Sequence, residues 1–210
     1  MKESIIKSLV LVILVLVFAV SFVSPTEAQK KVKPVVLKGT YGVIGHDVCV
    51  GNWLFGGPPD IYWTKTSTIQ GTATFYPDET GMGEFDQLSI IHPLDKMPPG
   101  STSTTKISIT YTYSIDPVTR EITQVISGSG QFTSTSAPLA GKYLTFETYT
   151  QTGFVSLDKG TIISSTIPIN SDPDQFTRIV SIWNDPEHTQ LYGEQQETCQ
   201  RNRVSTQIID

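Results

Sequence analysis

The sequence predicts an all-β protein, an antiparallel up-and-down meander closed into a barrel of about eight to ten strands. Three observations support this fold class. Threonine, serine, valine, isoleucine and tyrosine dominate the chain after its first segment, and these residues favour strands over helices. Apolar and polar residues alternate with the period of a strand, and turn sequences separate the alternating stretches.

The clearest alternation is KISITYTYSI, residues 106–115. Apolar side chains occupy the odd positions from Ile107 to Ile115, and serine or threonine occupies the even positions between them. Successive side chains of a strand point to opposite faces, so this stretch predicts a strand with one buried face.

Similar stretches predict ten strands. In order, they cover residues 36–44, 48–55, 61–76, 84–91, 104–116, 120–134, 142–157, 160–169, 175–184 and 189–200. The turn sequences DPVT at 116–119 and LDKG at 157–160 join long strands, and Gly160 stands where a hairpin can require a positive φ. The segments 55–60 and 92–103, rich in proline and glycine, are predicted loops.

A meander of this length must protect its edge strands from pairing with other chains. Closure into a barrel removes the edges, whereas two packed sheets protect them less completely. The barrel is therefore the favoured architecture, and a two-sheet β-sandwich is the alternative.

The first 28 residues have the pattern of a secretory signal peptide. Lys2 and Lys7 flank the start, an apolar run follows at 8–23, and small residues lead to a predicted cleavage site after Ala28. The alternative is an uncleaved membrane anchor. Residues 29–210 are then one domain, without a membrane span after cleavage, located in the periplasm, at the cell surface or outside the cell.

The formal net charge is −5, which argues against nucleic acid as a partner because nucleic-acid binding needs basic surfaces. The oligomeric state cannot be deduced from the sequence.

The two cysteines, Cys49 and Cys199, are expected to form a disulfide because the chain is exported. Cys49 lies near the first strands and Cys199 in the last one, which are neighbours in a closed up-and-down barrel. The bridge would therefore join the barrel's seam, with the two Cα atoms roughly 4.4–6.8 Å apart.

No catalytic, metal or cofactor site is predicted. His46 and Cys49 are three positions apart and so point to opposite faces of an extended strand, while Asp47 is expected at a strand end or turn. The histidines lack the clustered spacing of a metal site. Carboxylates such as Asp47, Glu84, Asp86 and Glu147 could pair across strands, but the sequence selects no pair.

Four aromatic residues on predicted strands are the candidates for lining a ligand cavity: Tyr111, Tyr113, Phe146 and Trp183. In a wide barrel they would surround a small apolar ligand, and in a narrow barrel they would form the core.

The stretch KGTYGVIG at 38–45 resembles the first strand of the calycin-type barrels, the lipocalins and avidins. The resemblance implies that a basic residue late in the chain, Arg201 or Arg203, packs against Tyr41. Ser127–Phe132 is similar to a glycine-rich strand of the allene oxide cyclase and dirigent barrels, and the whole chain resembles small exported bacterial proteins.

These observations favour an exported, non-enzymatic β-barrel that binds a small apolar ligand or an envelope partner. A barrel-type cyclase or isomerase and a β-sandwich adhesion or matrix module are the alternatives.

Overall fold

The computed structural model describes residues 33–53, 62–93, 101–135, 139–166 and 177–208. The predicted signal peptide and the predicted loop at 55–60 lie outside these residues, as does most of the predicted loop at 92–103. The described residues from Pro34 onwards belong to one compact unit. None of them forms a helix long and apolar enough to cross a membrane.

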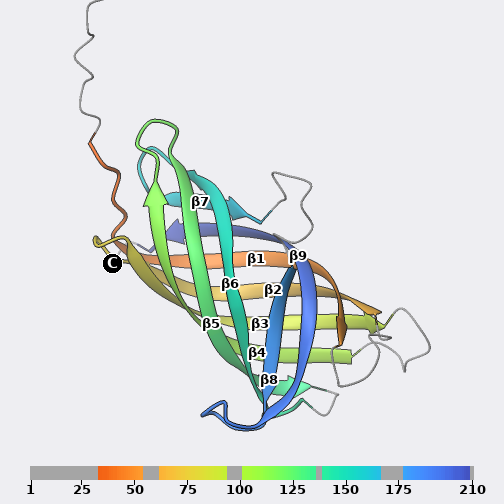
Figure 1. Ribbon diagram of the computed structural model, residues 1–210. Coiled ribbons are helices and arrows are strands. Elements are labelled where there is room, and N and C mark those ends of the chain that lie inside the picture. Colours follow the sequence, from red (N-terminus) through yellow and green to blue (C-terminus); the bar gives the residue numbers. More distant parts are fainter. Residues whose placement is uncertain (1–32, 54–61, 94–100, 136–138, 167–176, 209–210) are drawn as a thin grey trace, which may run out of the picture. The chain divides into compact units, whose positions relative to one another are not determined.

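The fold is a closed antiparallel β-barrel (Figure 1), which confirms the predicted fold class. Each strand from β1 to β6 pairs with the next along the chain, and β1 also pairs with β9, so the sheet closes on itself. The alternative of a two-sheet sandwich is wrong for this reason. The strands are β1 Gly39–Trp53, β2 Tyr62–Phe75, β3 Thr80–Pro93, β4 Ser101–Ile115, β5 Glu121–Thr135, β6 Tyr143–Val155, β7 Thr161–Ser165, β8 Thr177–Trp183 and β9 Leu191–Gln207.

Strands β7 and β8 share one position in the barrel wall, between β6 and β9 (Figure 1). β7 pairs with the end of β6 at 152–155, and β8 pairs with its beginning at 143–146. Thr166 follows β7 and continues the contact with β9, because it exchanges hydrogen bonds with the backbone of Cys199 and Arg201. The wall therefore has eight positions although the chain supplies nine strands.

Several strands differ in length from those predicted. β3 begins at Thr80 instead of residue 84 and β4 at Ser101 instead of residue 104, so the described ends of the predicted loop at 92–103 belong to strands. The predicted strands 36–44 and 48–55 form the single strand β1, because Gly45 and His46 stay extended and pair with both β2 and β9. β9 continues to Gln207, beyond the predicted end at residue 200. Its polar sequence resembles a surface segment, but its long pairing with β1 holds it in the wall.

The tight turns place positive φ angles at residues other than glycine. In the turn at 157–160, Lys159 has φ 64°, whereas the prediction assigned the positive φ to Gly160. The Asp158 carboxylate accepts a hydrogen bond from the Gly160 N–H, and the Lys159 ammonium donates one to the carbonyl of Val36. These bonds stabilise the left-handed conformation at Lys159, one position before the predicted Gly160.

One end of the barrel is closed by an aromatic cluster and by the segment that precedes β1. The Phe75 ring makes edge contacts with Tyr41, Tyr111 and Tyr113, with centroids 5.1–5.2 Å apart. Leu37 is completely buried, and its carbonyl accepts a hydrogen bond from the Tyr113 hydroxyl. The odd positions of β4 from Ile107 to Ile115 all pack in this core, as the alternation predicts.

A β-bulge between β5 and β6 shapes the opposite wall. The register shifts between Ile126 and Gly128, so that Phe146 and Tyr149 both face the interior although they are three residues apart. Gly128 lies at the bulge, where a Cβ atom would come within 2.5 Å of the Ser108 carbonyl oxygen and 2.7 Å of the Phe146 ring. The bulge and the close packing against Ser108 and Phe146 together account for glycine at position 128.

We expect Gly128→Ala to lower the free energy of unfolding by about 1–3 kcal/mol, because the methyl group would overlap backbone that cannot move independently. Denaturant unfolding followed by circular dichroism measures the change. Gly42→Ala is the matched control: its Cβ would have no neighbour closer than 3.9 Å, so that variant should be as stable as the parent protein. Equal stability of both variants would contradict the packing argument.

Candidate functional site: a charged cluster inside the barrel

The Cys49–Cys199 disulfide joins β1 to β9 at the barrel's seam, as predicted. The two residues are direct partners in the strand register, and both side chains are buried. Their Cα atoms are 4.0 Å apart, closer than predicted. Directly opposed residues of antiparallel strands can approach to about 4.5 Å, at the short end of the predicted range, and the observed 4.0 Å lies just below that value. The bridge also fixes which side chains of β1 and β9 face inward.

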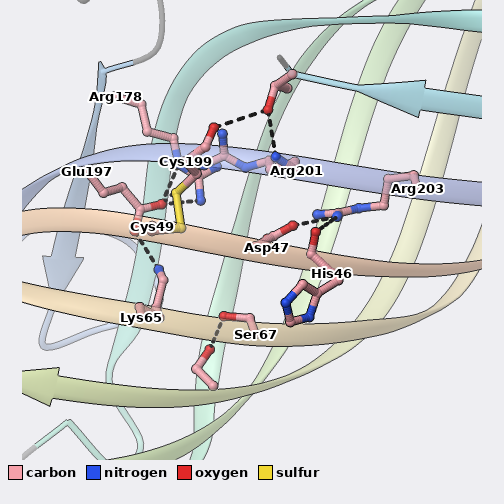
Figure 2. The surroundings of a disulfide bond; sticks show 12 residues. His46, Asp47, Cys49, Lys65, Ser67, Arg178, Glu197, Cys199, Arg201 and Arg203 are labelled. Atoms are coloured by element: carbon pink, nitrogen blue, oxygen red, sulfur yellow. Dashed lines mark hydrogen bonds and ion pairs between the residues drawn. A yellow bond between two sulfur atoms is a disulfide. The ribbon is translucent and has the colours of Figure 1, made fainter. Parts of the chain in front are cut away.

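Charged side chains lie next to this disulfide inside the barrel (Figure 2). Glu197 is two residues before Cys199 and Arg201 two residues after it, so both share the inward face of β9. Lys65 reaches the same region from β2 and Arg178 from β8. We call these four residues together with Asp47 and Arg203 the interior charge cluster.

Glu197 is the centre of the cluster. Its side chain has no exposed surface, and its carboxylate forms ion pairs with three cations. The shortest distances are 2.5 Å to Lys65 Nζ, 2.5 Å to Arg178 Nη2 and 3.3 Å to Arg201 Nη2. A buried carboxylate is stable only when such partners replace its water shell. Here three cations contact a single carboxylate.

The second carboxylate of the cluster is Asp47, which corrects the prediction that it lies at a strand end or turn. It is in the middle of β1, 3% exposed, and its Oδ1 accepts a hydrogen bond from Arg203 Nη1 at 2.5 Å. His46 precedes it and is exposed, and its carbonyl oxygen accepts a hydrogen bond from the same Arg203 nitrogen at 3.5 Å. Asp47 is therefore a buried ion-pair partner rather than a surface residue.

Aromatic rings hold the two buried guanidinium groups in place. The Arg178 guanidinium lies over Phe146 and Tyr149, at 4.6 and 5.3 Å from the ring centroids. Arg201 lies over Tyr149 at 4.8 Å. The bulge in β6 makes this possible because it turns both rings inward. Stacking on rings orients a guanidinium while leaving N–H donors at its edge.

The pKa values in the cluster follow from this crowding. Burial acts to raise the pKa of Glu197, but the charges of Lys65, Arg178 and Arg201 outweigh burial and hold it well below its usual range. Burial and repulsion from Arg178 lower the pKa of Arg201 to about 10. For Arg178, burial lowers the pKa, but the Glu197 charge more than offsets this and the pKa is raised. All three groups are ionised at neutral pH, and Glu197 is a poor proton acceptor.

The lowered pKa of Glu197 predicts acid sensitivity. In the unfolded chain a glutamate has a pKa of about 4.3, above the folded value, so ionised Glu197 stabilises the fold at pH values above roughly 4.3. This stabilisation is lost as the pH falls below that value towards the folded pKa.

We therefore follow the NMR chemical shift of the Glu197 carboxyl carbon as the pH is lowered. We expect it to show no sign that the carboxylate becomes protonated until the barrel itself unfolds. Unfolding is followed in the same samples by near-UV circular dichroism. Protonation of Glu197 in the folded barrel near its unfolded-state pKa would show that the three cations do not hold its charge.

Two small cavities adjoin the charge cluster. The larger has a volume of about 60 Å³ and lies between apolar residues such as Val43, Ile69 and Ile107 and the three arginines Arg178, Arg201 and Arg203. The smaller, of about 40 Å³, is lined by Lys65 and Glu197 among others. Arg178, Gln87, Ile107 and Phe146 line both. Pockets for drug-sized ligands typically measure about 300–1,000 Å³, so these cavities suit much smaller molecules.

The structure separates the four aromatic residues predicted to line a cavity. Tyr111 and Phe146 line the larger cavity, and Phe146 also lines the smaller one. Tyr113 belongs to the aromatic cluster at the closed end, where its hydroxyl donates to the carbonyls of Leu37 and Tyr76. Trp183 lines neither cavity. It donates a hydrogen bond to Thr145 and packs beside His188.

The remaining candidate groups do not join the cluster. Glu84, Asp86 and Glu147 are exposed. Cys49, Cys199 and Glu197 lie close enough to resemble a set of metal ligands, but the cysteines are bonded to each other and Glu197 is bonded to cations. Arg201 and Arg203 are opposite Asp47 and Gly45 in the register, well away from Tyr41. The contact with Tyr41 that the calycin resemblance implies is therefore not formed.

Lys65, Arg178 and Glu197 were not among the site residues predicted from the sequence. One signal could have found part of this set. The predicted disulfide faces inward, so residues two positions from each cysteine share its face, which points to Asp47, Glu197 and Arg201. No comparable signal marks Arg178, since its inward position depends on how β8 fits into the wall.

The fold and the site define this protein as a closed antiparallel β-barrel with a buried charge cluster and two small interior cavities. Comparisons with models of known protein families, with curated proteins and with solved structures found no match.

Proposed function

We propose that the protein is an exported, non-enzymatic barrel that binds a small molecule in its interior. The observation that carries this proposal is the larger cavity, which lies between an apolar wall and three arginine side chains. A barrel of this width can fill its interior with apolar side chains, and buried charges reduce rather than add stability relative to such a core. An interior that contains both buried charges and unfilled volume is better explained by ligand binding than by a contribution to the stability of the fold.

The ligand differs from the wholly apolar one that the sequence suggested. The hydroxyls of Tyr41, Tyr111 and Tyr113 donate to backbone carbonyls. The polar side chains that line the larger cavity are those of arginine, glutamine and serine residues and of Asp47, which is paired with Arg203. Export is supported by the N-terminal pattern and by the disulfide. The cyclase or isomerase alternative has less support, because both carboxylates of the cluster are engaged in ion pairs.

Native mass spectrometry of the protein purified from its own cell envelope tests this function. We expect the mass of the chain from residue 29, less two hydrogens for the disulfide, with an additional small-molecule mass that gentle activation releases. The same protein unfolded and refolded in ligand-free buffer is the control. A preparation that carries the cleaved mass alone, and to which an envelope extract restores nothing, would contradict interior binding.

A further inference from the structure

The interior charge cluster contains more positive than negative charge. The cations are Lys65, Arg178, Arg201 and Arg203, and the carboxylates are Asp47 and Glu197. Asp47 neutralises Arg203, and Glu197 can neutralise only one of the other three cations. Four positive charges less two negative ones leave an excess of two within the described residues, although the whole chain has a net charge of −5.

This excess is buried. The side chains of Lys65, Arg178 and Arg201 are 10%, 13% and 3% exposed, so water can screen them only weakly. Buried charges without a counter-charge are costly, and proteins normally pair them or neutralise them with a bound ion. The excess therefore points to an anion as the missing partner.

Arg201 is the cation least satisfied by the protein. Its contact with Glu197 is the longest of the three, at 3.3 Å, and it involves one nitrogen of the guanidinium. A guanidinium has five N–H donors, and the described residues show this single side-chain hydrogen bond for Arg201. The group also lines the larger cavity, together with Arg178 and Arg203.

The apolar wall of the same cavity indicates an organic ligand rather than a bare inorganic ion. Guanidinium groups bind carboxylates through paired N–H donors, and an alkyl group would lie against Val43, Ile69 and Ile107. The larger cavity, at about 60 Å³, has less than half the volume of the roughly 150 Å³ cavity that accommodates benzene. It therefore suits only a carboxylate with a very short tail.

We propose that the larger cavity binds the carboxylate of a small organic acid, with Arg201 as its main donor and Arg178 contributing charge. This inference rests on the proposed function and names the chemical class of its ligand. The Tyr149 ring positions both arginines, and the ligand's negative charge offsets part of the excess in the cluster.

Propionate and propionamide test the proposal, because the two molecules have nearly the same shape and differ in charge. We expect sodium propionate to raise the thermal midpoint of the mature, disulfide-bonded protein in proportion to the logarithm of its concentration, as a ligand of the folded state does. Propionamide should have no effect, and sodium chloride at the same ionic strength should have much less. Isothermal titration calorimetry gives the affinity.

Arg201→Gln should weaken propionate binding at least about tenfold, which corresponds to the loss of one charge-assisted interaction. Lys106→Gln is the matched control, since Lys106 is exposed on β4 and its substitution removes the same charge from the outer face. If Arg201→Gln does not fold, Arg201→Lys serves instead: it keeps the charge but loses the paired donors, and it should still weaken binding.

Three results would overturn the carboxylate assignment. Equal binding of propionate and propionamide would show an interior site that does not depend on charge, which leaves the proposed function intact. Equal stabilisation by chloride would show a site for inorganic anions. Absence of binding by all three would also reject this inference, while the proposed function would still be decided by the mass measured for the native protein.

Discussion

Glu197→Gln should be among the most damaging single substitutions in this protein. The glutamine has the same shape but no charge, so Lys65, Arg178 and Arg201 would face one another inside the barrel without a counter-charge. Removing one partner of a buried ion pair typically costs about 3–5 kcal/mol. Because whole domains are stable by only about 5–15 kcal/mol, we expect a variant that is partly unfolded or that unfolds at much lower denaturant concentration.

Urea unfolding followed by circular dichroism and tryptophan fluorescence measures this loss. Glu84→Gln provides the control, since Glu84 is exposed on the outer face of β3 and the charge change is identical. The control should match the parent protein. The charge-cluster argument would be wrong if Glu197→Gln lost less than about 1 kcal/mol, because that is the size of an exposed salt bridge.

The second large effect is expected from the disulfide. Its two cysteines are separated by 150 residues, so the bridge closes almost the whole described chain into a loop. The chain-entropy model gives a loop of this length about 5 kcal/mol of stabilisation, and removal of native disulfides commonly costs about 2–5 kcal/mol. We expect the double variant Cys49→Ala, Cys199→Ala to lose stability in this range.

Reduction of the parent protein should reproduce the loss, and a reducing agent should have no effect on the double variant. Both results are read as free energies of unfolding from complete denaturant curves, each fitted with its own slope, because removing the bridge changes the unfolded chain. A double variant as stable as the oxidised protein would show that strand pairing between β1 and β9 is sufficient to hold the seam closed. The loss should appear mainly as faster unfolding if the seam forms after the transition state.

The barrel could be predicted because its signals are local and repeated. The alternation in β4 and the turn sequences at 116–119 and 157–160 each specify an element without knowledge of its neighbours. Closure followed from the need to protect strand edges, and the disulfide followed from the predicted export and the cysteine count. The pairing of Cys49 with Cys199 in the structure agrees with both arguments.

The charge cluster was harder to predict because it violates the rule that strands bury apolar residues. On β9 the inward positions include Glu197, Cys199 and Arg201, while the outward positions are also polar, so no alternation is visible. Only long-range pairing decides which face is inside. The same applies to β1, where the predicted break between residues 44 and 48 hid the inward direction of Asp47.

The shared position of β7 and β8 determines the direction in which β9 meets β1. Successive strands of a meander alternate in direction, so the first and ninth strands of nine separate positions would run the same way and could meet only as a parallel pair. β7 and β8 both run opposite to β6 and to β9, so together they occupy the place of one strand. The count of positions is thereby even. β1 and β9 meet antiparallel, which places Cys49 directly opposite Cys199.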